Sequence, residues 1–409
     1  MSPRQSNILW IVTTQWRASA TGYAGDANAR TPFLDALAAE SVNYTQAVTP
    51  HPFGPFARAA LLTGVPSPEN GVRDYFDPLP VAARTVAHEM KDRGYATAFF
   101  GKWHLGKRDP AAALVGEAHA KTIVPPGARG GFEFWEGFES GFLLNDPWLH
   151  GTRWAEPMQV KGYQSELLCE RARDWCRSGF TPDISSRISG VNPDLRPSFC
   201  VVSLEAPHPP YDAPAAGVKA RTPGEIVLSA NVPLGGEVEA KARKELAGYY
   251  SHIEATDRAI GRLLSATRKE ETVVVFTSVH GDMHGSHGLF RKGWPHEESV
   301  RVPLLIRTPG VKPRKEDAAV SLVDMAWTTL NPTASQPTHA KISMPSVVAL
   351  PHQCDRAWRG ARTKARKLVL NADGSPWLLF DLENDPLEMK NLASEPARWA
   401  EIEELSRLV

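Results

Sequence analysis

The stretch that decides the fold is Asn7-Ile8-Leu9-Trp10-Ile11-Val12-Thr13, near the start of the chain. Its central residues are all large and apolar, and the run is as short as a typical β-strand, which favours a buried strand over a helix. Similar strand-like runs occupy residues 96–100, 199–204 and 272–277. We therefore predict at least four strands that contribute to a common core.

Helical patterns separate these strands. The potential capping residue Thr31 precedes Pro32 at a first helical position, and an amphipathic pattern over 81–94 ends at Gly94. Further helical segments are predicted at 58–62, 164–177 and 237–268. Because strands and helices alternate, we predict an α/β fold with a large central mixed, mostly parallel sheet flanked by helices.

The C-terminal part of the chain has a different pattern. Two strand-like runs, 367–370 and 377–382, flank the turn-forming segment 371–375, and a helical segment follows at 395–408. Two strands joined by a short turn are typical of an antiparallel hairpin. We therefore predict a small antiparallel sheet with a C-terminal helix.

Loop-rich stretches suggest where the domains divide. Residues 105–130 and 178–198 are rich in Gly, Pro and Ser, and so is 331–350, which is expected to link two domains. We predict a large α/β domain over 1–335 that carries the active-site pocket. A smaller C-terminal α+β domain is predicted over 336–409.

The composition indicates which partners and which cellular location to expect for this protein. Lys plus Arg and Asp plus Glu both number 46, so neither nucleic acid nor an anionic membrane is expected as a partner. The N-terminal apolar run is too short for a signal peptide, and no segment approaches the roughly 18 apolar residues of a membrane span. The cysteines, expected to be reduced thiols, are Cys169, Cys176, Cys200 and Cys354. These features predict a cytoplasmic protein.

Six blocks of sequence carry the functional information. They are 7–17 together with 30–35, 58–64, 101–107, 205–211, 276–282 together with 287–293, and 380–386. In this order, and over nearly the whole chain, they resemble the type I sulfatase family of the alkaline-phosphatase superfamily. The resemblance implies a pocket at the C-terminal ends of the central strands, where Thr14, His208 and Val279 converge.

The resemblance also implies three chemical components. One is a cysteine or serine matured to formylglycine, whose hydrate attacks sulfur. Another is a divalent cation, usually calcium, because hard cations prefer anionic oxygen ligands. The third is a ring of Lys, His and Arg side chains, because an anionic transition state is stabilised by fixed positive charge.

The sequence departs from the family pattern at the nucleophile and at the metal. Gly54 occupies the nucleophile position, or Phe53 if one insertion is allowed, and neither residue can become formylglycine. A threonine and a valine stand where the family has metal-binding aspartates. The degenerate metal positions are Thr14, Gln15, Val279 and His280. We therefore expect no cofactor, and calcium in particular is not expected.

The anion-binding part of the family pattern is present. By the resemblance, pocket residues are matched by Arg58, Lys102, His104, His208 and Lys292. We expect His104, His208 and His280 to act as general acids or bases, with Lys102 and Lys292 as electrostatic stabilisers. The expected substrate-binding residues are Arg58, Lys102, His208, Lys292, Gln15 and Trp103. This selective retention favours a working pocket for an anionic small molecule.

A metal site of a different kind is an alternative. The spacing of His280, His284 and His287 would suit zinc or iron if the three residues shared one face of a helix. The glycines between and after them favour a loop instead. We therefore favour histidines without a shared metal.

Three tryptophans near the motifs also have two interpretations. Trp16, Trp103 and Trp294 are candidates for lining the pocket. Aromatic residues beside strand ends more often belong to the core. Only Trp103 is included among the expected substrate-binding residues.

Three functions are compatible with these patterns. The first is a metal-independent enzyme that acts on a sulfated or otherwise anionic small molecule by elimination or group transfer, for example in specialised biosynthesis. The second is a non-catalytic pseudo-sulfatase that binds an anionic ligand or a partner. The third is a conventional hydrolase of sulfuric esters or phosphoesters. The selective loss of nucleophile and metal ligands favours the first, and the sequence does not define the oligomeric state.

Overall fold

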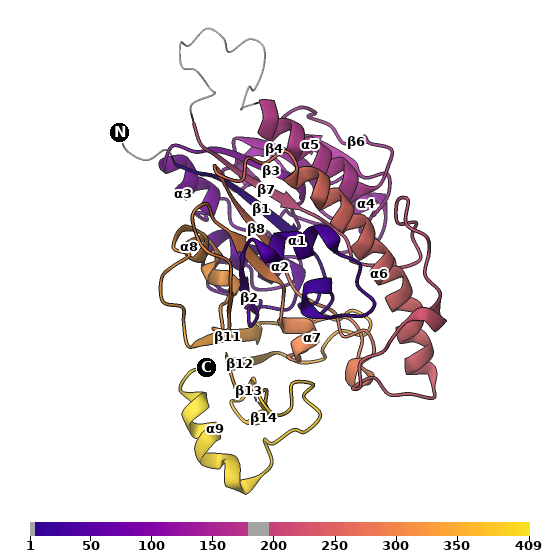
Figure 1. Ribbon diagram of the computed structural model, residues 1–409, viewed down its shortest axis with the longest axis vertical. Coiled ribbons are helices and arrows are strands. Elements are labelled where there is room, and N and C mark those ends of the chain that lie inside the picture. Colours follow the sequence, from indigo (N-terminus) through magenta and orange to yellow (C-terminus); the bar gives the residue numbers. More distant parts are fainter. Residues whose placement is uncertain (1–4, 179–195) are drawn as a thin grey trace.

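The computed structural model describes residues 5–178 and 196–409 (Figure 1). Within these residues, ten strands form one mixed sheet in the order β10-β2-β9-β8-β1-β7-β3-β4-β5-β6. The strands are β1 (Asn7–Thr13), β2 (Val42–Tyr44), β3 (Ala96–Lys102), β4 (Phe134–Phe138), β5 (Trp148–Gly151), β6 (Met158–Gln159), β7 (Ser198–Ser203), β8 (Thr272–Ser278), β9 (Leu304–Arg307) and β10 (Arg314–Glu316). Strands β8, β1, β7, β3 and β4 are parallel. The predicted α/β fold with a large, mostly parallel central sheet is confirmed.

Helices cover both faces of this sheet. The α-helices of the described residues are α1 (Pro32–Ala39), α2 (Gly54–Thr63), α3 (Val86–Asp92), α4 (Glu117–Ala120), α5 (Gln164–Ser178), α6 (Glu237–Leu264), α7 (Glu297–Val300), α8 (Met325–Leu330) and α9 (Trp399–Ser406), and α9 belongs to the smaller unit described below. Ile8, Trp10 and Val12 of β1 join a core with α2 and α3, whereas Leu9 and Ile11 join a core with α1, α5 and α6. The apolar run is uninterrupted because neither face of β1 meets water. None of the described helices is long and apolar enough to span a membrane.

The parallel strands bring the segments that follow them to one edge of the sheet. Val12 is aligned with Ser203 of β7 and with Thr277 of β8, and Ser203 is aligned with Gly101 of β3. Each of these residues lies at or next to the end of its strand. The loops after β1, β3, β7 and β8 therefore begin side by side.

A smaller unit lies at the lower end of the molecule in Figure 1. In the described chain its antiparallel sheet has the order β11-β12-β13-β14, and α9 packs against it. The strands are β11 (His339–Met344), β12 (Trp358–Thr363), β13 (Arg366–Asn371) and β14 (Pro376–Asp381). Glu297 of α7 joins the two sheets by ion pairs with Arg362 and Lys367, at 3.0 Å each. The predicted small sheet is confirmed, and the domain boundary at 335–336 stays a prediction.

Several helices differ from their predicted bounds, and the different starts of α2 and α3 have local causes. Helix α2 begins at Gly54, before the predicted start, because Pro55 is compatible with a first helical turn. The pattern over 81–94 yields only the shorter α3. Thr85 ends the preceding turn and caps the helix, since its Oγ1 accepts a hydrogen bond from Ala87 N at 3.2 Å.

The predicted loop regions contain regular structure. Strand β11 lies inside 331–350, so the expected linker is partly an element of the small sheet. Helix α4 lies inside 105–130. For the predicted loop 178–198, residues 179–195 lie outside the described residues.

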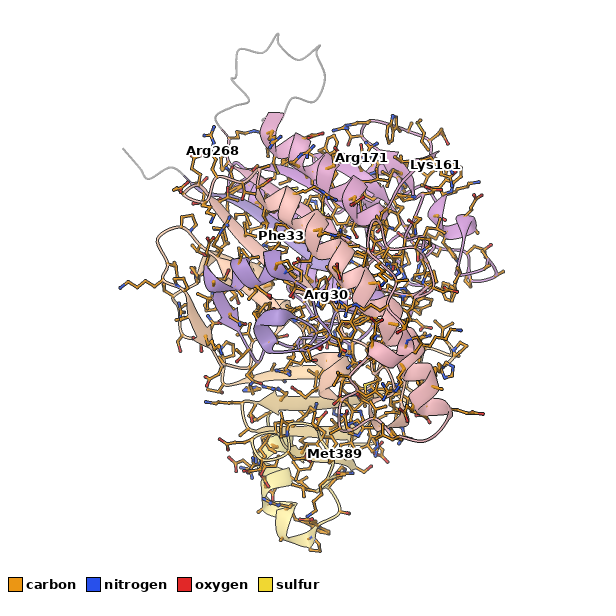
Figure 2. The ribbon with its side chains drawn as sticks, turned by 45° about the vertical axis from the view of Figure 1, so that its right-hand side comes forward. Arg30, Phe33, Lys161, Arg171, Arg268 and Met389 are labelled. Atoms are coloured by element: carbon orange, nitrogen blue, oxygen red, sulfur yellow. The ribbon has the colours of Figure 1, made fainter. Side chains whose placement is uncertain are left out.

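The start of α1 is capped by a residue that is distant in sequence. The side chain of Thr31 does not cap α1. Instead, Asp257 of α6 accepts hydrogen bonds from the backbone N–H groups of Leu34, at 2.9 Å, and Phe33, at 3.2 Å. Phe33, labelled in Figure 2, packs over Gly261, where an added Cβ would lie 2.4 Å from the ring. The predicted helix start is right, but the capping group comes from a neighbouring helix.

Candidate functional site

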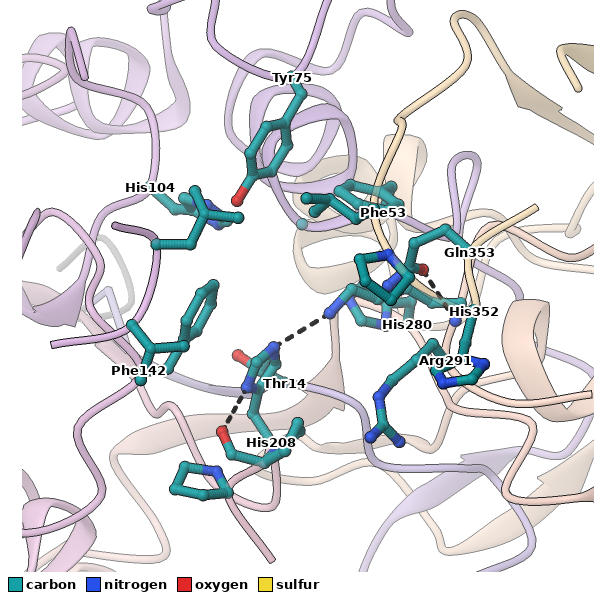
Figure 3. A pocket seen from close by; sticks show the side chains of 18 of the residues that line it. Thr14, Phe53, Tyr75, His104, Phe142, His208, His280, Arg291, His352 and Gln353 are labelled. Atoms are coloured by element: carbon teal, nitrogen blue, oxygen red, sulfur yellow. Dashed lines mark hydrogen bonds between the residues drawn. The ribbon is translucent and has the colours of Figure 1, made fainter. Parts of the chain in front are cut away.

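A cavity of about 320 Å³ opens at the C-terminal edge of the central strands (Figure 3). Among the described residues, the basic or imidazole side chains that line the cavity are Lys102, His104, His208, His280, Arg291, Lys292 and His352. Its other described lining residues are Thr14, Phe53, Gly54, Tyr75, Leu114, Val115, Phe142, Pro209, Pro210, Leu350, Pro351 and Gln353. This described lining contains no aspartate or glutamate. The cavity therefore combines basic groups with an extensive apolar surface.

Lys102, the last residue of β3, is held by a buried carboxylate. Its Nζ donates a hydrogen bond to Glu205 Oε1 at 2.6 Å, and both side chains are buried. The same Nζ lies 4.6 Å from the centre of the Phe142 ring. Burial lowers the pKa of Lys102 to about 8, although Glu205 opposes this shift. Lys102 is thus paired with a negative charge before any ligand binds.

Lys292 has neutral partners instead. Its Nζ donates a hydrogen bond to Gln15 Oε1 at 2.6 Å and lies 3.0 Å from His208 Nε2. No carboxylate of the described chain forms an ion pair with Lys292. Burial, and then the nearby Lys102 charge, lower the pKa of Lys292 to about 7. A large fraction of this side chain is therefore a neutral amine at neutral pH.

His208 lies between the two lysines. Its Nδ1 is 2.8 Å from the Pro209 carbonyl oxygen, so Nδ1 carries the proton and Nε2 accepts from Lys292. Glu205 Oε1 lies 3.5 Å from the same Nδ1. The imidazole stacks on Phe142 with ring centres 4.5 Å apart. Burial and Lys292 hold the pKa of His208 well below its usual range, so the ring is neutral.

His104 and His280 offer opposite hydrogen-bonding atoms. His104 Nε2 accepts from Arg108 Nη1 at 2.9 Å, so its Nδ1 carries a proton, and His280 Nδ1 donates to the Gly281 carbonyl at 2.8 Å, so its Nε2 carries a lone pair. His104 Nδ1 and His280 Nε2 are both buried and have no hydrogen-bond partner in the described chain. Burial and nearby cations hold both pKa values well below the usual range. These two imidazoles thus offer a free donor on His104 and a free acceptor on His280.

Gly54, the first residue of α2, leaves space beside His104. A Cβ at this position would lie 2.9 Å from His104 Nδ1 and 3.1 Å from Cε1. Any larger side chain would therefore crowd the free N–H of that imidazole. Phe53, the other predicted nucleophile position, contributes its ring to the cavity wall.

Arg58 and Gln15 lie behind the residues that line the cavity. Arg58 donates to Thr14 Oγ1 and to Ser203 Oγ at 2.7 Å each, and the Thr14 hydroxyl donates to the Leu204 carbonyl at 2.9 Å. Burial lowers the pKa of Arg58 to about 10, which leaves it charged near neutral pH. Both residues were predicted to bind substrate. Here Arg58 orients Thr14, and Gln15 orients Lys292.

The degenerate metal positions offer a poor set of ligands for calcium. Val279 is fully buried in the apolar core. The Thr14 hydroxyl is already hydrogen bonded, and Gln15 Oε1 is taken by Lys292. Calcium requires about six to eight oxygen ligands, several of them anionic. The residues present do not fit that ion.

The histidines of the alternative metal site have other neighbours. His284 Nε2 lies 3.5 Å from the Tyr211 hydroxyl, and the His287 ring packs on His296 with centres 4.7 Å apart. Across residues 5–178 and 196–409, no group of three or more His, Cys, Asp or Glu side chains is placed to hold a metal ion. The zinc or iron alternative therefore gains no support from this geometry.

Trp103 is not among the described lining residues, contrary to its expected role in substrate binding. It is fully buried and packs edge-on against Phe99, with ring centres 5.1 Å apart. Lys102 points to the cavity, whereas the next side chain points into the core. Trp16 and Trp294 are likewise outside the described lining.

Four buried charged residues near the cavity were not predicted from the sequence. They are Arg108, Glu139, Glu205 and Asp282. Glu139 Oε1 lies 3.4 Å from Arg108 Nε, and Asp282 Oδ2 accepts from the Tyr211 hydroxyl at 2.9 Å. Glu205 belongs to the block 205–211 and Asp282 to the block 276–282. Their place in these motifs could have predicted that they lie near the pocket. Arg108 and Glu139 carried no comparable signal.

The segment before β12 closes one side of the cavity. Leu350, Pro351, His352 and Gln353 belong to its lining. Gln353 Oε1 accepts from the backbone N–H of Lys292 at 3.2 Å. Figure 3 shows His352 and Gln353 on the side opposite His104 and Phe142. The small C-terminal unit thus reaches the site through a segment that begins at the last residue of the predicted linker 331–350.

Comparisons with known proteins agree with this architecture. The family model "Sulfatase" matches residues 6–333. The ulvan-active sulfatase of Formosa agariphila is 32% identical over 428 residues, covering 96% of this chain and 78% of the relative. The choline-sulfatase of Rhizobium meliloti is 27% identical over 444 residues, covering 97% and 84%. The structure of the putative sulfatase yidJ from Bacteroides fragilis has a TM-score of 0.82 at 24% identity, covering 99% of this chain and 94% of that one.

Proposed function

Because the chain belongs to the sulfatase family, we propose that its cavity binds a sulfate ester or another anionic small molecule. The protein then transforms this molecule by acid–base chemistry of its own side chains, through elimination or group transfer, without formylglycine or a metal ion. One observation carries the proposal. Lys102, Lys292 and His208 meet in a cavity whose described lining contains no carboxylate.

Anion binding follows from the charges around the cavity. Lys102 supplies a buried positive charge, and its partner Glu205 stands behind it rather than in the lining. A bound anion would gain a second cation when Lys292 takes up a proton. Charge-assisted hydrogen bonds of this kind are strong where water is excluded. The rings of Phe53 and Phe142 would contact the less polar part of the ligand.

The two free imidazole atoms supply the chemistry. In an elimination, His280 Nε2 would accept a proton from carbon, and the C–H electrons would form a new C=C bond. The C–O bond to sulfate breaks in the same reaction, and the leaving oxygen takes that electron pair. His104 Nδ1–H and Lys102 would stabilise the negative charge that develops on the leaving group.

Binding is tested with inorganic sulfate, with chloride at equal ionic strength as the reference. We expect sulfate to raise the melting temperature and to give a saturable calorimetric titration. Lys102→Met should weaken binding by about tenfold or more, since a buried charge-assisted contact is lost. Lys91→Met, which removes an exposed lysine, is the matched control. Equal sulfate affinity in both variants and the parent chain would contradict the proposed pocket.

Turnover is tested with a panel of sulfate esters in water enriched in ¹⁸O. Elimination breaks the C–O bond, so released sulfate keeps its original oxygens. Hydrolysis by attack at sulfur places one solvent oxygen in the sulfate. Unlabelled sulfate together with an unsaturated product supports elimination, and labelled sulfate contradicts it. Saturable binding without any turnover would indicate a pseudo-sulfatase.

A conventional hydrolase is the second candidate, because the relatives described above are named as sulfatases. It requires a nucleophile and a cation site, and neither Gly54 nor Val279 contributes a suitable group. The test is sulfate release with added calcium and with a chelator. Release that depends on calcium would favour this candidate over the metal-independent one.

A further inference from the structure

We propose that Lys292 is an amine nucleophile that forms an imine with the carbonyl group of an anionic compound, such as a 2-oxo acid. The inference rests on the proposed function only for the recognition of the anionic group. It is carried by the partners of Lys292 Nζ and by the buried His208 and Glu205 next to it. The buried Lys292 side chain is one of the residues that line the cavity.

The hydrogen-bond partners of Lys292 are compatible with a neutral amine. A neutral lysine nitrogen has two N–H bonds and one lone pair. Two acceptors surround Lys292 Nζ, namely Gln15 Oε1 at 2.6 Å and His208 Nε2 at 3.0 Å. They account for both N–H bonds and leave the lone pair unused. An ammonium group would have a third N–H bond without a partner in the described residues.

The surrounding charges agree with this geometry. Burial, Lys102 and Arg291 lower the pKa of Lys292, and Asp282 and Glu205 oppose them. The result is a pKa of about 7, compared with the ordinary value of 10.5. Desolvation and a neighbouring cation are the two usual ways in which a lysine becomes nucleophilic near neutral pH.

Lys292 contacts a base, His208, and this base in turn lies next to a carboxylate, Glu205. His208 Nε2 is 3.0 Å from Lys292 Nζ, and Glu205 Oε1 is 3.5 Å from His208 Nδ1. The order is nucleophile, base and carboxylate, which is the arrangement of activated nucleophiles in general. The imidazolium that forms when His208 accepts a proton would be stabilised by Glu205. The Pro209 carbonyl keeps the ring in the tautomer with Nε2 free to accept.

The reaction balances with the carbonyl compound as the only co-reactant. The Lys292 lone pair attacks the carbonyl carbon, and the π electrons move to the carbonyl oxygen. The nitrogen loses a proton to His208 Nε2, which passes it to that oxygen to give a carbinolamine. A second proton transfer from nitrogen and departure of the hydroxyl group as water leave a C=N bond. No electrons are gained or lost overall.

Lys102 is unsuited to the same role. Its Nζ is bound to the Glu205 carboxylate at 2.6 Å, which favours the ammonium form. We therefore assign the two lysines different tasks. Lys102 holds the carboxylate of the incoming 2-oxo acid, and Lys292 reacts with its carbonyl.

The test is reductive trapping of the full chain. The protein is incubated with glyoxylate and sodium cyanoborohydride at about pH 7, and the labelled lysine is located by peptide mapping. We expect one adduct per chain, on Lys292, formed at least about tenfold faster than on exposed Lys91 in the same digest, because the lowered pKa of Lys292 makes much of it a free amine at this pH. Lys292→Arg should abolish the fast phase. The comparison of two peptides from the unaltered chain does not depend on whether that variant folds.

The outcomes separate this inference from the proposed function when sulfate binding is measured on the same preparation. Fast labelling of Lys292 that is slowed by sulfate supports both. Sulfate binding with Lys292 labelled no faster than Lys91 overturns the imine inference and leaves the anion pocket intact. Fast labelling that sulfate does not slow supports the nucleophile and contradicts the anion pocket. Neither binding nor fast labelling overturns both.

Discussion

Two groups of buried residues meet in the cavity, and they handle charge in different ways. In the Lys102 cluster (Lys102, Glu205, Arg108 and Glu139), each cation lies next to a carboxylate. In the Lys292 cluster (Lys292, Gln15, His208 and His280), the one lysine contacts an amide and a neutral imidazole. The carboxylate beside Lys102 favours its ammonium form, and a pKa of about 8 leaves this lysine mostly charged at neutral pH. The Lys292 cluster can change its protonation state near neutral pH.

Under the proposed function, this difference would allow the pocket to react without a metal ion. Fixed charge binds and orients an anion but supplies neither a lone pair nor a mobile proton. A lysine with neutral partners supplies both, since burial lowers the pKa of its ammonium group. The two clusters lie close enough that Lys102 is itself one cause of the lowered pKa of Lys292. Substitutions that affect only one cluster test this division.

The largest effect is expected from Lys102→Met. The change leaves the Glu205 carboxylate buried without its lysine, and breaking a buried ion pair in this way costs about 3–5 kcal/mol of unfolding free energy. Urea denaturation measures the loss. The double change Lys102→Met with Glu205→Gln should recover part of it, because no uncompensated charge then remains. A loss below about 1 kcal/mol in the single variant would show that the pair is not the fixed charge described here.

The second prediction concerns the pH dependence of Lys292→Met. The pKa of Lys292 is about 7 in the folded chain and ordinarily 10.5, so between these values the unfolded chain binds more protons. Burial of Lys292 therefore destabilises the protein below about pH 7, and this cost fades as the pH rises towards 10. The stability of the variant relative to the parent should be greater at about pH 6.5 than at about pH 9.5, by roughly 2–4 kcal/mol.

The variant also loses the contacts of Lys292 with Gln15 and His208. This loss lowers its stability equally at both pH values, so it cancels when the two relative stabilities are subtracted. Exposed Lys91→Met is the matched control and should show little pH-dependent change. A relative stability that is the same at the two pH values would mean that Lys292 keeps its ordinary pKa. The two clusters would then not differ in the way proposed.

Much of the fold followed from the sequence because the decisive strands are buried on both faces. The run at Asn7–Thr13 favoured a strand of a covered sheet, and the order of strands and helices indicated parallel pairing. The sequence analysis did not predict β2, β4, β5, β6, β9, β10, β11 or β12. Strands β6 and β10 carry few apolar residues, whereas β4 and β9 are apolar but only five and four residues long. The cap of α1 was assigned to Thr31 rather than Asp257 because a long-range contact leaves no local pattern.

The site was predictable to the extent that motifs place residues at strand ends. Lys102, His104, His208, His280 and Lys292 were all named in advance, and all line one cavity. Trp103 was misplaced because adjacent residues at a strand end point to opposite sides. The charge states were not predictable, since they depend on partners far away in sequence. Lys292 and Gln15 are the clearest case, because only the fold brings their side chains together.

The third prediction is that sulfate affinity depends on pH through Lys292. Protonation of this side chain as the pH falls through about 7 adds a second cation to the pocket. From about pH 8.5 to about pH 6, affinity should rise about tenfold more in the parent chain than in Lys292→Met, which corresponds to about 1.4 kcal/mol. Calorimetric titration at matched ionic strength measures both. An identical pH profile in the two proteins would assign the dependence to Lys102 or to the imidazoles.

The smallest effect is expected from Gly54→Ala, beside the Lys102 cluster. The new Cβ would lie 2.9 Å from His104 Nδ1, so the imidazole must shift slightly, and its Nε2 is held by Arg108. Alanine also favours a helix over glycine by roughly 0.5–1 kcal/mol, which offsets the crowding. Unfolding free energy should therefore change by less than about 1 kcal/mol. Sulfate affinity should nevertheless fall by about threefold, because the methyl group occupies the space in front of the free N–H. Unchanged affinity would show that His104 does not contact the anion and that binding depends on the two lysines alone.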